Sequence, residues 1–146
     1  MNHDFQHYQR GLVLLEQNRY EEAANEFRDL LAANPEDDQA LNLLARCQMS
    51  LPQTEKDALA TIGRAIGFNA QEPDHFIIQS LIQSRLDDPK TAIKSANEAI
   101  ALDAAQPEAF SARAMAYTRQ SQWAKAETDC RQALELDPDN DFAANL

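Results

Sequence analysis

The segment between Pro107 and Pro138 carries a pattern of apolar and polar positions that recurs along the whole chain. Its apolar residues form two stripes at helical spacing, the first containing Phe110, Ala114 and Tyr117 and the second Ala126, Cys130, Ala133 and Leu134. Four polar residues at 119–122 separate the stripes and leave no room for a strand. The pattern predicts two short antiparallel helices, which need neighbours because they cannot bury their apolar faces alone.

The same pattern returns at intervals of 34 or 35 residues, in four copies. Small or apolar residues occupy corresponding positions in each copy, as in the columns Ala23, Ala58, Ala92, Ala126 and Leu31, Ile66, Ile100, Leu134. All six prolines fall at predicted helix boundaries, which is an observation independent of the apolar period. A period near 34 residues is typical of an array of helix-turn-helix repeats. We therefore predict an all-α fold.

The sequence resembles the tetratricopeptide repeat (TPR) family over nearly its whole length. The first and fourth copies carry the resemblance best, through Gly11, Tyr20, Ala23, Phe27 and Pro35, and through Phe110, Ala114, Tyr117, Trp123, Ala126, Ala133 and Pro138. The chain departs from the family pattern where Tyr is preferred, at Gln48 and Gln83, and where Leu is preferred, at Arg10 and Arg113.

The resemblance implies a right-handed α-solenoid of four helix-turn-helix TPR units in a single domain, residues 1–146. The repeats span about 4–37, 38–72, 73–106 and 107–140, and residues 139–146 look like the short start of a further capping helix.

Local signals place the helix boundaries. We expect helices at about residues 3–17, 20–33 and 55–66, and helices that open at Pro35, Pro73, Pro89 and Pro107. Gly67 stands where a left-handed residue would end a helix, and Ser121 where a side chain would cap one. Gly11 lacks a side chain, so we expect the next helix to approach it closely, with Ala23 as the small residue facing it.

Charge and hydropathy restrict the possible partners. The net charge is −11, so the chain would repel phosphates and we expect no nucleic-acid binding. No apolar run approaches 18 residues, so we expect no direct membrane insertion. The N-terminus has neither the basic head nor the apolar core of a secretory signal, and two cysteines make no disulfide framework. We expect a cytoplasmic protein, and the acidic, Lys-poor composition suggests a bacterial one.

No constellation of residues indicates chemistry, so we interpret the chain as a non-enzyme without cofactor or metal. The glycines are scattered, Cys130 occupies an apolar column, and Cys47 is expected to be structural. His3 and His7 could share a helix face and bind a metal, but no third ligand is evident, so we expect two solvated histidines. His75 is expected at the surface, and the many carboxylates on outer faces.

Function is then expected on the surface that the array creates. The resemblance implies a concave groove, lined by the first helix of each repeat, that binds a peptide or helical segment of a partner protein. The groove positions fall on Phe5, Tyr8, Leu12, Asn42, Arg46, Met49, Ile77, Leu81, Arg85, Ser111, Met115 and Arg119.

This set combines large apolar residues with three arginines in a chain of only 13 Lys and Arg. It suits a partner with apolar anchors and acidic groups or a free C-terminal carboxylate, which arginine can grip with two parallel hydrogen bonds. The alternative is that the arginines pair internally and that the apolar positions belong to the core. A chaperone-type carboxylate clamp is not expected, because only Asn42 fits it.

Two other functions stay open. The chain could be a structural module that forms a homodimer through its C-terminal end, which the partial helix at 139–146 covers poorly. It could also be the N-terminal adaptor region of a larger enzyme or membrane-associated protein.

Overall fold

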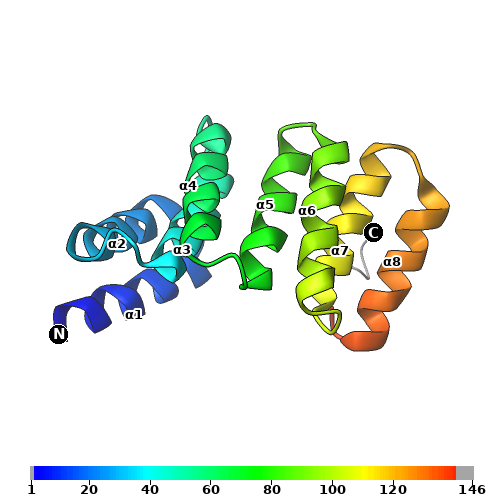
Figure 1. Ribbon diagram of the computed structural model, residues 1–146. Coiled ribbons are helices and arrows are strands. Elements are labelled where there is room, and N and C mark those ends of the chain that lie inside the picture. Colours follow the sequence, from blue (N-terminus) through cyan, green and yellow to red (C-terminus); the bar gives the residue numbers. More distant parts are fainter. Residues whose placement is uncertain (1, 141–146) are drawn as a thin grey trace. The chain divides into compact units, whose positions relative to one another are not determined.

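The computed structural model describes residues 2–140, which form helices joined by short turns and no strand (Figure 1). The helices within this range are α1 (Asn2–Glu16), α2 (Tyr20–Ala33), α3 (Asp38–Ser50), α4 (Glu55–Phe68), α5 (Pro73–Arg85), α6 (Pro89–Leu102), α7 (Pro107–Arg119) and α8 (Trp123–Leu136). The predicted all-α helical-repeat class is confirmed. The predicted partial helix at the C-terminus lies mostly outside the described residues.

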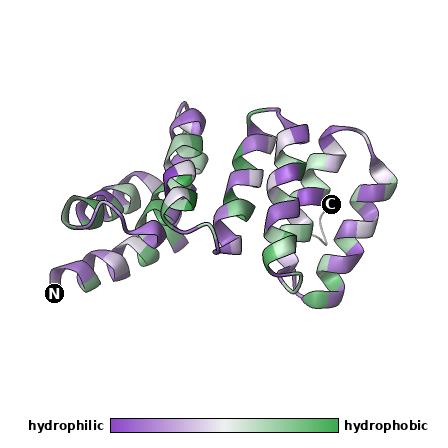
Figure 2. Ribbon diagram, viewed as in Figure 1, coloured by the Kyte–Doolittle hydropathy of each residue, from purple (hydrophilic) through white to green (hydrophobic). Residues whose placement is uncertain are grey.

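The helices divide into two compact units, Met1–Ala70 and Gln71–Leu146, each holding two helical hairpins. Hydrophobic and hydrophilic residues alternate in bands along the helices (Figure 2), as expected when each helix buries one stripe. In the first unit α2 packs against both α1 and α3, and α3 packs against α4. In the second unit α7 packs against α5, α6 and α8.

Each unit has a core of small and branched side chains. The core of the first unit consists of Ala23, Ala24, Phe27, Leu30, Ala40, Leu44 and Cys47. One core cluster of the second unit consists of Ile77, Ala99, Ala109 and Ala112, and a neighbouring one joins Phe110 to Ala133. Alanine at so many buried positions lets helix axes approach closely, so the apolar stripe of one hairpin reaches the next.

Gly11 lies at a close approach of α1 and α2, but its partner differs from the expected one. A Cβ atom at Gly11 would lie 2.5 Å from Cε1 of Phe27, and the nearest atoms all belong to that ring. Ala23 is fully buried but is not what limits the approach. The absence of a Gly11 side chain therefore makes room for a fully buried aromatic ring rather than for a small residue.

Three helices begin as the prolines indicate. Pro73, Pro89 and Pro107 occupy the first turn of α5, α6 and α7, and the Asp88 carboxylate accepts a hydrogen bond from the Thr91 amide at the start of α6. Pro35 does not open a helix: it lies in the turn before α3, which begins at Asp38. There the carboxylate of Asp37 caps the helix by accepting from the Ala40 amide at 3.1 Å.

The turn inside each hairpin contains one residue in the left-handed region, although none of them is glycine. These residues are Asn18, Gln53, Asp87 and Ser121, with φ values of 60°, 67°, 58° and 58°. Ser121 therefore forms the turn and is not the predicted cap of α8, where Gln122 holds the cap position. Gly67 lies inside α4 without positive φ, so it does not end that helix, which continues to Phe68.

His75 is fully buried, not at the surface as expected. It lies on α5, which packs against both α6 and α7 and also buries Ser80, Gln83 and Ser84. Two packed neighbours cover more of a helix's circumference than one apolar stripe. The hydrophobic pattern of α5 alone therefore understates how much of it is enclosed.

The glycines offer a matched pair of substitutions. Gly11→Ala should lower the free energy of unfolding by about 1–3 kcal/mol, because the new Cβ would overlap the buried Phe27 ring. Gly63→Ala in α4 meets nothing within 4 Å, so it should raise that free energy by about 0.5–1 kcal/mol through helix propensity alone. Urea denaturation of both variants measures the difference, and equal effects would contradict the close packing of α1 on Phe27.

Candidate peptide-binding faces

The predicted groove residues of the first unit lie on α1 and α3. Phe5 and Tyr8 are exposed, Phe5 by 66%, and Leu12 is half-buried. On α3 the side chain of Asn42 is buried and accepts a hydrogen bond from Nε of Arg46 at 2.9 Å. This bond holds the base of the Arg46 guanidinium group on the helix surface, beside the half-buried Met49.

In the second unit the predicted residues lie on α5 and α7, which pack against each other. Leu81 and Met115 are half-buried at corresponding repeat positions, and Arg85 and Arg119 are exposed in the last turns of the two helices. These arginines also lie where the backbone carbonyls at a helix end favour positive charge. The helices thus offer two short rows, each with an apolar side chain followed one turn later by a cation.

Three of the predicted residues are enclosed. Asn42, Ile77 and Ser111 are each less than 5% exposed, and Ile77 belongs to the core of the second unit. The Ser111 hydroxyl donates to Oδ1 of the buried Asn140 at 3.4 Å. A partner could therefore touch the exposed members of the set, while these three support the helices beneath.

Comparison with known proteins identifies the repeat. One tetratricopeptide repeat model matches residues 8–73 and another matches residues 107–140, and together they cover more than half of the chain. The chain belongs to the tetratricopeptide repeat family. TPR repeats are typically non-catalytic modules for protein interaction, and this is the general function that the fold supports.

Solved structures of other TPR proteins share the fold. MamA from Desulfovibrio magneticus RS-1 is 15% identical, with 94% of this chain and 77% of that chain covered and a TM-score of 0.76. YrrB, described as a TPR protein with an unusual peptide-binding site, is 21% identical over 95% and 71%, with a TM-score of 0.75. The first TPR of Spaghetti (RPAP3), bound to the HSP90 peptide SRMEEVD, is 21% identical over 74% and 87%, with a TM-score of 0.69. No curated protein matches the chain.

One buried ion pair was not foreseen from the sequence. Nε and Nη2 of Arg113 on α7 donate to the two carboxylate oxygens of Asp129 on α8, at 2.8 and 2.7 Å. Asp129 is only 3% exposed, so this carboxylate is not on an outer face as expected. The guanidinium group also lies over the rings of Phe110 and Tyr117. The available signal was a charged residue in a column where TPR repeats prefer Leu.

This pair holds the guanidinium group of Arg113 against the buried carboxylate of Asp129. The bond to Asp129 raises the pKa of Arg113, although burial acts in the opposite direction. Arg113 thus pairs internally, but it is not one of the three predicted groove arginines. Arg85 and Arg119 are exposed in the last turns of their helices.

The thiols of Cys47 and Cys130 are poorly suited to nucleophilic chemistry. Burial raises the pKa of Cys47 to about 11, so the reactive thiolate is scarce at neutral pH. Burial and the nearby Asp129 and Glu127 carboxylates also raise the pKa of Cys130.

Within the residues that the structure describes, every helix is too short or too polar to cross a bilayer.

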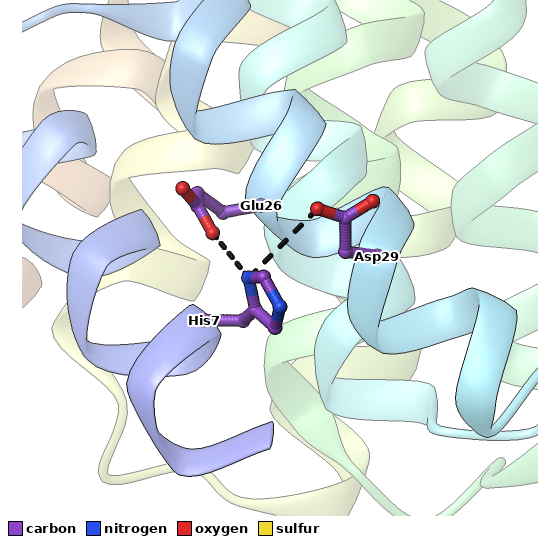
Figure 3. A group of neighbouring side chains, drawn as sticks. All are labelled: His7, Glu26 and Asp29. Carbon is purple, nitrogen blue, oxygen red and sulfur yellow. Dashed lines mark hydrogen bonds and ion pairs between the residues drawn. The ribbon is translucent and has the colours of Figure 1, made fainter. Parts of the chain in front are cut away.

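His7 is not solvated as expected. Its Nδ1 atom lies 2.5 Å from Oε2 of Glu26 and 3.8 Å from Oδ2 of Asp29, both on α2 (Figure 3). The sequence spacing of His3 and His7 indicated a shared face of α1, but it did not indicate that this face meets two carboxylates.

Removing one partner of the Arg113–Asp129 pair should lower the free energy of unfolding more than removing both partners. Asp129→Ala should lower the free energy of unfolding by about 3 kcal/mol, the lower end for buried pairs, because Arg113 is partly exposed. Adding Arg113→Leu should recover most of that loss, since an apolar residue fits beside Phe110 and Tyr117. Chemical denaturation tests this, and additive losses in the double variant would show that the pair is not coupled.

Proposed function

We propose that this TPR protein binds a peptide or helical segment of a partner protein along the exposed faces of its first helices. The partner would present apolar anchors next to acidic side chains or a free C-terminal carboxylate. The observation that carries the proposal is the arrangement on α5 and α7, where Leu81 and Met115 precede Arg85 and Arg119 by one turn. The structures of YrrB, described as having an unusual peptide-binding site, and of RPAP3 bound to a peptide support a peptide as the ligand class.

The charge distribution of the chain would direct an acidic peptide to this face rather than to the rest of the surface. The net charge is −11, so an acidic peptide is repelled by most of the surface. The exposed guanidinium groups of Arg85 and Arg119 are local exceptions that can donate paired hydrogen bonds to a carboxylate. The half-buried Leu81 and Met115 offer apolar surface beside them, and methionine adapts readily to different ligand shapes.

Selection from a displayed library of peptides with free C-termini tests the proposal. Enriched peptides should combine apolar anchors with acidic residues or the terminal carboxylate. Arg85→Glu with Arg119→Glu should weaken the affinity of a selected peptide about 10-fold or more, because hydrogen bonds to charged groups are worth about 1.5–3 kcal/mol each. An amidated form of the peptide separates a terminal carboxylate from acidic side chains.

A matched control keeps the charge change and moves it to other helices. Lys94→Glu with Arg131→Glu alters exposed residues of α6 and α8 in the same unit and should leave the affinity nearly unchanged. Circular dichroism of both double variants shows whether the helices persist. Equal weakening in the two folded variants, or no enrichment of acidic or carboxylate-ended peptides, would contradict the proposed face.

Self-association is the second candidate function. Trp123 at the start of α8 is 63% exposed, beside a hollow of about 290 Å³ that Thr118, Ala126, Glu127 and Cys130 also line. An exposed tryptophan beside a hollow is a common anchor of protein interfaces. Sedimentation of the chain at several concentrations distinguishes a homodimer formed here from a monomer that binds peptides.

A further inference from the structure

One imidazole and two carboxylates converge between the two helices of the first repeat. His7 projects from α1, and Glu26 and Asp29 project from α2, which packs against it (Figure 3). One ligand atom from each side chain lies within 4.8 Å of the other two. Glu26 and Asp29 are three residues apart, so they share a face of α2 and both reach the same nitrogen of His7.

We propose that His7, Glu26 and Asp29 form a binding site for a divalent transition metal ion of the Zn²⁺ class. Zinc accepts imidazole nitrogen and carboxylate oxygen together, in sites with three protein ligands and a water. The imidazole disfavours Mg²⁺ and Ca²⁺, which prefer oxygen ligands alone. All three ligands come from two helices packed against each other, so the backbone already holds them near one point.

The distances fit a site in its metal-free state. Ligand atoms about 2.0–2.2 Å from a tetrahedral zinc ion lie roughly 3.3–3.6 Å from one another. The 3.8 Å between His7 Nδ1 and Asp29 Oδ2 is close to that separation. The 2.5 Å between His7 Nδ1 and Glu26 Oε2 is a hydrogen bond, so Glu26 must move outward by roughly 1 Å when an ion enters. Rotation of its side chain is enough for that movement.

Metal binding at this site displaces the proton from Nδ1 of His7. The carboxylate of Glu26 accepts the hydrogen bond, so Nδ1 of His7 carries the proton that is donated. Coordination needs the lone pair of that nitrogen. A neutral imidazole supplies it by shifting the proton to Nε2 without net release, whereas an imidazolium releases one proton from Nδ1 to solvent.

The surroundings leave the site open to an ion. Asp29 is 64% exposed at its side chain, which leaves room for a water in the fourth position. Arg10 lies with Nη1 4.0 Å from Oε1 of Glu26, the oxygen that does not face His7. This cation opposes a metal ion electrostatically, but it also turns Oε2 of Glu26 toward the site. The two carboxylates outweigh its single charge.

Calorimetric titration of the full chain, without an affinity tag, with zinc chloride tests the site. We expect one zinc ion per chain, and no heat of binding with magnesium chloride. His7→Gln should weaken zinc binding about 100-fold or more, because loss of an outer-shell partner alone already costs 10–100-fold. His3→Gln is the matched control: it lies one turn earlier on α1, is exposed, and should leave the affinity nearly unchanged.

Two further variants make the assignment sharp. Asp29→Asn should weaken zinc binding without unfolding the chain, because this side chain is largely exposed. Cys130→Ser should leave binding intact, which excludes the half-buried thiol as the zinc ligand. Zinc binding that survives His7→Gln, that is lost equally in His3→Gln, or that is absent from the wild-type chain at millimolar zinc would overturn the proposal. None of these results depends on whether the chain binds a peptide.

Discussion

Close packing through small side chains at the helix crossings is the constraint on which this structure depends. Ala23, Ala58 and Ala92 are fully buried at one repeat position, and Ala65, Ala99 and Ala133 are fully buried at another. A helical hairpin of this length cannot bury its own apolar stripes, so each must lie close enough to share them with the next. Gly11 meets the same requirement by leaving room for the ring of Phe27. Larger residues at these positions would separate the helices and expose the stripes.

This packing determines which side chains remain for function. The alanine columns and Phe27 occupy the crossings, so the large residues on the first helices are left partly outside the core. Leu81 and Met115 are half-buried for this reason, and Arg85 and Arg119 extend beyond them at the helix ends. The proposed peptide-binding face and the proposed metal site both use side chains outside the alanine columns that form the helix crossings. His7 occupies the repeat position of Leu41 and Phe110, where it meets carboxylates of α2.

The sequence predicted what depends on periodicity and local chemistry. The repeat period, the helices and the proline boundaries at Pro73, Pro89 and Pro107 follow from spacing, because each repeat has the same packing problem. Features that depend on contacts across helices did not follow. Two of these features, the Arg113–Asp129 pair and the approach of Glu26 and Asp29 to His7, join residues whose spacing carries no motif. The third is the burial of His75. The helix end predicted at Gly67 and the cap predicted at Ser121 were wrong. The position of a helix end or cap depends on where the neighbouring helix allows the chain to turn.

Methionine-methyl NMR during titration with a selected peptide would test the central claim most directly. The chain has only three methionines, and two of them, Met49 on α3 and Met115 on α7, belong to the proposed faces, while Met1 does not. We predict that the methyl signal of Met115, of Met49 or of both shifts saturably while the signal of Met1 stays. Saturable binding that moves neither Met49 nor Met115 would contradict the claim that partners bind along the first helices.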